Sequence, residues 1–168
     1  PTLLLVAGAH GAATEAMMAC AKLAEVLETG HDLAGRQRDD LRAAAEGVRL
    51  VMVPIANPDG RARVEIDSLC GGTEDDLRYW GQGHWSDGTP VGWPECKRYQ
   101  PLPLDRVRFA GGYVNEDGYN LMYDIVPGNL QTRETEGLFR LAAAEAPDLM
   151  LNDHSCQFGG GILAPKQW

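Results

Sequence analysis

The chain has little of several features that mark specialised classes of protein. Four cysteines in 168 residues are too few for a disulfide scaffold. No apolar run approaches the roughly 18 residues of a membrane span, so we expect no membrane partner. Lys and Arg, 15 in all, are outnumbered by 24 Asp and Glu, which gives a net charge of −9. Because binding to nucleic-acid phosphates requires a basic face, we expect no nucleic-acid partner.

The residues that are present fit a globular α/β domain. The hydrophobic content of 44% is that of an ordinary folded protein. Continuous apolar runs predict buried strands, and the segments between them have helical periodicity, an order typical of a parallel sheet covered by helices. The expected strands are residues 3–7, 48–55 and one that begins at 149, and the expected helices are 16–28, 38–46 and 132–146. We therefore predict a three-layer sandwich with a largely parallel, mixed sheet.

Residues 57–120 have a different composition. Regular periodicity disappears, and glycine, proline and aromatic residues accumulate, among them Tyr79, Trp80, Trp85, Trp93 and Tyr99. A stretch of this length predicts a long loop with a functional role. The alternative is a small local core of aromatic side chains beneath that loop.

Two histidines, His10 and His154, each follow an expected buried strand. In parallel sheets, ligands bind at the carboxyl ends of the strands, where these two side chains would meet. Glu15 lies just beyond His10. Two histidines and one carboxylate form the ligand set of a catalytic zinc ion, which lowers the pKa of its bound water to about 7. For either histidine taken alone, a hydrogen-bonded structural role is the favoured interpretation.

The ordered motifs resemble the zinc carboxypeptidase family of metallopeptidases from Leu3 to about Ser155. They are, in chain order, His10-Gly11, Asn57-Pro58-Asp59-Gly60, Glu134-Thr135-Glu136, Ala146-Pro147-Asp148-Leu149 and Asp153-His154-Ser155. The resemblance implies that His10 and His154 are zinc ligands. It also implies hydrolysis of an amide bond by a metal-activated water. The substrate would be a peptide or an acylated amino acid.

Several positions depart from the family pattern. Ala13 stands where the family has its glutamate ligand, so we assign the third ligand to Glu15. Asn120 replaces an aspartate that orients a zinc histidine, and its amide oxygen can still accept the imidazole N–H. Met122 and Tyr123 replace the Asn-Arg pair that binds the substrate carboxylate. Because neither side chain can bind a carboxylate through charge, a simple exopeptidase is disfavoured.

The family also has an arginine that polarises the scissile carbonyl and a general-base glutamate from a later strand. Arg98 is our first choice for the arginine and Arg108 the second, with a solvated surface arginine as the alternative for each. We expect the general base to lie beyond Trp168, so that residues 1–168 form part of a larger catalytic domain.

Two further functions remain open at this point. One is a deacylase of the same fold that acts on N-acyl amino acids, and the other is a non-catalytic binding module. The cysteines leave alternatives as well. Cys70 and Cys96 can form a disulfide if the protein is secreted. Cys156 is either a metal contact or a small buried thiol.

Overall fold

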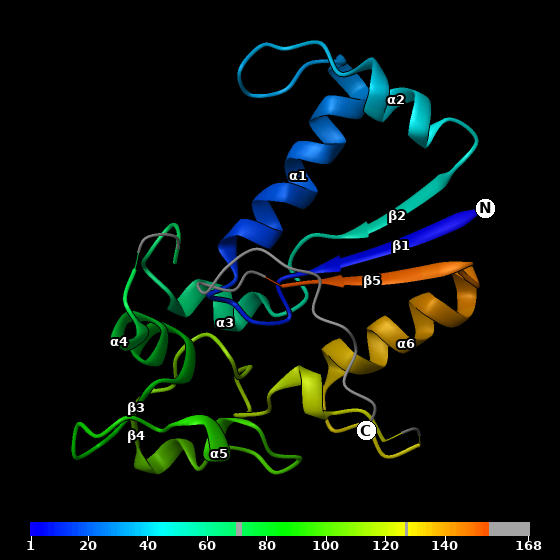
Figure 1. Cartoon of the computed structure of the whole chain (residues 1–168). Helices are drawn as coiled ribbons and strands as arrows, with labels where there is room; N and C mark the ends of the chain where they lie inside the picture. Colours follow the sequence, from blue (N-terminus) through cyan, green and yellow to red (C-terminus); the bar gives the residue numbers. More distant parts are fainter. Residues whose placement is uncertain (70–71, 127, 155–168) are drawn as a thin grey trace.

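The predicted sheet is present in the computed structural model, which describes residues 1–69, 72–126 and 128–154 (Figure 1). Strands β1 (Thr2–Ala7), β2 (Arg49–Val53) and β5 (Leu149–Asp153) are parallel, in the order β2-β1-β5. Leu4 is the partner of Val51 on one side and of Met150 on the other. The central strand is the best buried, since Leu4 and Val6 are 0% and 1% exposed. The α/β prediction is confirmed at this level.

The side chains of β1 alternate between two helical layers. Leu4 and Val6 pack towards Leu138 and its neighbours on α6 (Arg133–Glu145). Ala7 packs against Ala16 of α1 (Thr14–Thr29), on the other face of the sheet, as Figure 1 shows. This alternation is the two-residue period of a strand covered on both faces. The short helix α2 (Asp39–Ala45) follows α1 and leads into β2.

The region between β2 and α6 consists of short elements. They are α3 (Pro58–Arg63), α4 (Glu74–Asp76), the π-helical η1 (Leu77–Gln82), β3 (His84–Trp85), α5 (Trp93–Cys96), η2 (Leu104–Arg106), β4 (Val107–Phe109) and η3 (Leu121–Tyr123). Strands β3 and β4 pair in an antiparallel manner. No helix of the described ranges has both the length and the apolar character needed to span a bilayer.

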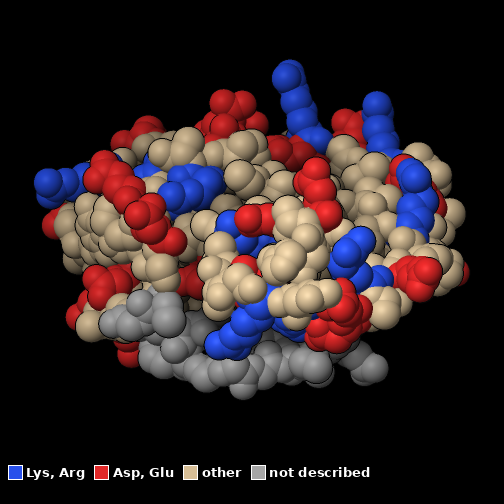
Figure 2. Space-filling model, turned by 90° about the horizontal axis from the view of Figure 1, so that it is seen from above, with Lys and Arg blue, Asp and Glu red and all other residues tan. Residues whose placement is uncertain are grey.

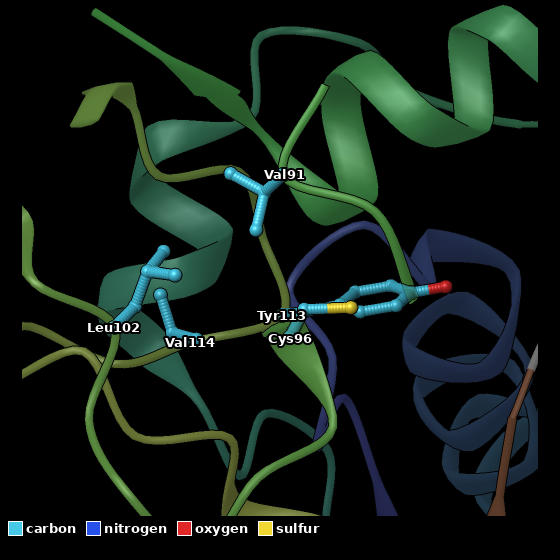
Figure 3. Packing of buried hydrophobic residues seen from close by; sticks show 5 residues of the cluster. All are labelled: Val91, Cys96, Leu102, Tyr113 and Val114. Atoms are coloured by element: carbon cyan, nitrogen blue, oxygen red, sulfur yellow. The ribbon is translucent and has the colours of Figure 1, made fainter. Parts of the chain in front are cut away.

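This irregular region has a core of its own. Figure 3 shows its five buried members, Val91, Cys96, Leu102, Tyr113 and Val114. The local core expected as an alternative is therefore present, but its composition differs from the expectation. Of the five aromatic residues that suggested it, Trp85 packs against this cluster and the Trp93 ring lies against its member Tyr113, whereas Tyr79 and Tyr99 are 43% and 59% exposed.

The loop after β1 is fixed by close backbone contact with this region. The N–H of Gly11 donates to the carbonyl of Gly112 over 2.6 Å. A Cβ atom built on Gly11 would lie 2.0 Å from the carbonyl carbon of Gly60, so only glycine fits there. The backbone that carries His10 is thus held against two other segments of the chain.

Candidate functional site

The two histidines predicted from the strand ends lie side by side. His10 follows β1 and His154 directly follows β5, and these strands are neighbours in the sheet. The ring centres are 5.2 Å apart, with an angle of 66° between the ring planes. The sheet therefore brings the first and last parts of the described chain to one point at its carboxyl edge.

The amide of Asn120 fixes the orientation and the tautomer of His10. Its Nδ2 donates to the carbonyl of Cys96 over 2.8 Å, and its Oδ1 accepts the N–H of Met122 over 3.2 Å. Oδ1 is therefore the atom that faces His10, 3.1 Å from Nε2. Because Oδ1 only accepts hydrogen bonds, His10 carries its proton on Nε2, and Nδ1 keeps a free lone pair. The expected hydrogen bond between Asn120 and His10 is present in this geometry.

Burial holds His10 in its neutral form. Desolvation lowers the pKa of His10 to about 3, and the positive charges of His154 and Lys97 act in the same direction, against the hydrogen bond from Asn120. The ring of Tyr113 stacks on His10 with centres 4.0 Å apart and covers one face of the imidazole. A neutral imidazole is the form that binds a metal ion.

A row of stacked groups continues outward from Tyr113. The ring of Trp93 lies 5.7 Å from that of Tyr113, and Lys97 Nζ lies 3.8 Å from the centre of the Trp93 ring. Our sequence reasoning did not identify Tyr113, Trp93 or Lys97 as site residues. The available signal was Gly111-Gly112 directly before Tyr113, since paired glycines indicate close approach of the backbone.

His154 is half-buried beside His10. Its Nε2 is buried without a hydrogen bond to any of the described residues. Burial lowers the pKa of His154, and the negative charge of Asp153 opposes this. A buried polar atom without a partner is uncommon in folded proteins and indicates a site for a ligand, an ion or water.

Glu15 lies in the first turn of α1 with its carboxylate engaged elsewhere. It accepts hydrogen bonds from the Ser68 hydroxyl and, over 2.8 Å, from the Leu69 N–H. Within residues 1–69, 72–126 and 128–154, no three His, Cys, Asp or Glu side chains form a group that could hold a metal ion. The structure thus brings the two histidines together but does not bring Glu15 into a three-ligand group with them.

The two arginine candidates lie in different surroundings. Arg98 is exposed and pairs with Glu95 in the preceding turn, and its Nε donates to the Pro94 carbonyl over 3.4 Å. Its neighbour Lys97, and not Arg98, contributes to the electrostatics of His10. Arg108 lies on β4 and lines a cleft with Tyr79 and His84.

The cysteines contribute little to this site. Cys96 is a buried free thiol, and burial raises its pKa to about 12, so it is protonated at neutral pH. Cys70 and Cys156 lie outside the described residues, and so do the hypotheses that concern them.

Three comparisons were made, with protein-family models, with curated proteins and with solved structures, and none of them gave a match for this chain.

Proposed function

We propose that His10 and His154 are two ligands of a zinc ion in a carboxypeptidase-like domain, and that the protein hydrolyses an amide bond, most readily in a peptide. The observation that carries the proposal is the pair of adjacent histidines at the carboxyl ends of β1 and β5, one of them neutral with its tautomer set by Asn120. Imidazole nitrogen suits zinc, and zinc-bound histidines usually donate their second N–H to a neighbouring acceptor.

The donor set fits zinc in part. His10 offers the lone pair of Nδ1, and His154 has a buried nitrogen that needs a partner. Glu15, our third ligand, would have to exchange its hydrogen bonds with Ser68 and Leu69 for the metal. When bound, zinc supplies a Lewis acid that polarises a carbonyl and acidifies water.

The protein's own groups have separate tasks in this proposal. Asn120 holds the His10 N–H, and Tyr113 keeps water from one face of the ring. Asp153 is not our choice of general base, because it is the register partner of Ala7, which packs against α1 on one face of the sheet. We therefore assign the general base to a carboxylate outside the described residues. Arg98 could polarise the scissile carbonyl only after its ion pair with Glu95 is broken.

The segment that would bind a substrate carboxylate contains no charge. Met122 and Tyr123 form η3, directly after Asn120, and burial raises the pKa of the Tyr123 phenol. A neutral phenol and a thioether favour substrates without a free terminal carboxylate near this point. This includes internal peptide bonds and, as a second candidate, the amide of an N-acyl amino acid.

The metal assignment is tested by zinc titration of the chelator-treated chain in a calorimeter. Removing one ligand leaves a poor site, so His154→Ala should weaken zinc binding at least 100-fold. Asn120→Ala should weaken it about 10- to 100-fold, because the loss of such supporting partners has effects of that size. His31→Ala is the matched control, since His31 is an exposed histidine that bonds to the Thr29 carbonyl. Equal zinc affinity of the wild type and His154→Ala would overturn the assignment.

The substrate assignment is tested separately with the full-length protein. Matched peptides with free and amidated C-termini should differ by less than about threefold in kcat/KM. A charge-assisted contact corresponds to about 1.5–3 kcal/mol, or roughly 10- to 100-fold. A preference of that size for the free acid would show that another residue binds the carboxylate. Faster hydrolysis of N-acyl amino acids than of peptides would favour the deacylase.

A further inference from the structure

A second cleft lies at the β3–β4 ribbon. Its volume is about 240 Å³, and its lining residues are Tyr79, His84, Gly88, Arg108 and Phe109. The rings of Tyr79 and Phe109 stack with centres 5.0 Å apart, and the His84 ring lies 4.9 Å from that of Tyr79. The cleft therefore combines aromatic walls with a guanidinium and an imidazole.

Buried polar atoms without partners occur on His84, which lines this cleft, and on Gln82, two residues earlier in the chain. Nδ1 of His84 is buried and has no hydrogen bond. The side-chain Nε2 and Oε1 of Gln82, a residue that is 1% exposed, are also buried without a hydrogen bond. Among the described residues, only four buried side-chain polar atoms lack a partner, and these are three of them. The fourth belongs to His154. Such atoms are rare in native proteins, and each one requires an explanation.

The backbone conformation of this segment is also unusual. Gln82 is the last residue of η1, and His84 begins β3 directly afterwards. π-Helical turns are rare and occur frequently at functional sites. The unpartnered polar atoms and the unusual helix therefore coincide at one short segment, residues 82–84.

Arg108 supplies an unengaged positive charge. Across residues 1–69, 72–126 and 128–154, no hydrogen bond or ion pair of its guanidinium is present, whereas Arg98 and Arg140 pair with acidic residues on their own helical turns. A guanidinium binds a carboxylate through two parallel hydrogen bonds. The chain carries a net charge of −9, and Figure 2 shows acidic side chains spread over one face of the molecule. This net charge disfavours ligands with several negative charges.

We propose that this cleft binds a small organic acid with one carboxylate and one aromatic ring. Arg108 would bind the carboxylate, His84 would contribute its imidazole, and the rings of Tyr79 and Phe109 would contact the ligand ring. The volume lies below the roughly 300–1,000 Å³ of sites for drug-sized ligands, which limits the ligand to about one ring. This site is separate from the His10–His154 pair and does not depend on its function.

The test is titration of the whole chain with benzoate, followed by calorimetry and by the imidazole C–H resonances of His84 in NMR spectra. We expect benzoate to bind and to shift the His84 resonances, and benzamide, the neutral analogue, to bind at least tenfold more weakly. Inorganic phosphate should not compete. Equal binding of benzoate and benzamide, or displacement of benzoate by phosphate, would overturn the proposal.

Variants of two nearby arginines complete the test. Arg108→Gln should weaken benzoate binding at least tenfold, and Arg108→Lys should restore part of it, because lysine keeps the charge but not the two parallel hydrogen bonds. Arg106→Gln is the matched control, since the Arg106 guanidinium lies 5.9 Å over the Trp85 ring and does not line the cleft. Arg108 is exposed and unpaired, so each variant should fold, which circular dichroism would verify. Unchanged benzoate binding by Arg108→Gln would also overturn the proposal.

Discussion

Around β1 the molecule is held together by apolar packing, whereas the region between β2 and α6 combines its small apolar core with buried polar side chains that bond to backbone. Leu4 and Val6 pack against apolar side chains of β2 and α6. In the irregular region, Asn57 is fully buried, and its Oδ1 accepts the Gly60 N–H over 2.9 Å. Asp124 accepts hydrogen bonds from the backbone of Gln131 and Thr132 in a similar manner.

This difference shows how backbone atoms are held in fixed positions without regular secondary structure. Apolar burial has no direction, so a sheet needs its repeating backbone bonds to fix the register. Each buried amide or carboxylate instead fixes specific backbone atoms at a specific distance. The candidate site lies at the junction of the two regions, since the sheet supplies His10 and His154 and the irregular region supplies Asn120 and Tyr113.

The largest effect should follow from Leu4→Ala in the sheet. Deleting a fully buried leucine side chain costs about 2–5 kcal/mol of unfolding free energy. Leu33→Ala is the control, because Leu33 is 75% exposed and its loss should have little effect. Urea unfolding curves would give both values.

The same unfolding curves test whether the two regions are independent. Three of the four tryptophans, Trp80, Trp85 and Trp93, lie in the irregular region, so in a Trp168→Phe background fluorescence follows that region. Far-ultraviolet circular dichroism is dominated by α1 and α6. Because the Gly11–Gly112 contact joins the regions, we expect the two signals to change together in Leu4→Ala. Separate transitions would show that the regions unfold independently.

The next effect is a pH dependence that His10 imposes at the junction. The His10 pKa is 6.5 in the unfolded chain and about 3 in the folded protein. Its contribution to stability is therefore fully present above pH 6.5 and is lost as the pH falls towards 3. At pH 4.5 the loss should be about 3 kcal/mol.

His10→Gln provides the comparison for this pH effect, because glutamine keeps an N–H donor for Asn120 and does not titrate. Unfolding free energies at pH 7.5 and 4.5, measured with a chelator present, should fall about 3 kcal/mol further in the wild type than in the variant. Parallel pH dependences of the two proteins would mean that His10 is not buried as described.

The smallest effect should come from Arg63→Lys in the irregular region. The guanidinium donates to the carbonyls of Gly111, Val114 and Asn115 over 2.8–3.0 Å. One ammonium group cannot reproduce this forked arrangement, so we expect a loss of about 1–2 kcal/mol. Arg140→Lys on the exposed face of α6 should cause no measurable change. Equal unfolding midpoints for both variants would show that the forked geometry of Arg63 is unimportant.

Much of the sheet was predictable from the sequence, and the adjacency of His10 and His154 followed from it. Apolar runs identify buried strands, and parallel neighbours present their carboxyl ends at one edge. The contact of Asn120 with His10 agrees with an expectation that the family resemblance supplied.

The remaining site residues depend on partners that are distant in sequence. Glu15 is close to His10 along the chain, but its carboxylate bonds to Ser68 and Leu69, which no local pattern indicates. Arg98 is engaged by Glu95, three residues earlier in the chain, a pairing that the sequence permitted but that our assignment did not weigh. Tyr113 was missed because its role depends on a backbone crossing far from any regular element.

The central position of β1 also determines when the candidate site can form during folding. Leu4 pairs with Val51, but its other partner is Met150, at the far end of the described chain. Closing so large a loop has a high entropic cost, and contacts between distant residues slow folding. In a chain emerging from the ribosome, β1 therefore keeps one edge unpaired until β5 has been synthesised, and β5 is followed directly by His154.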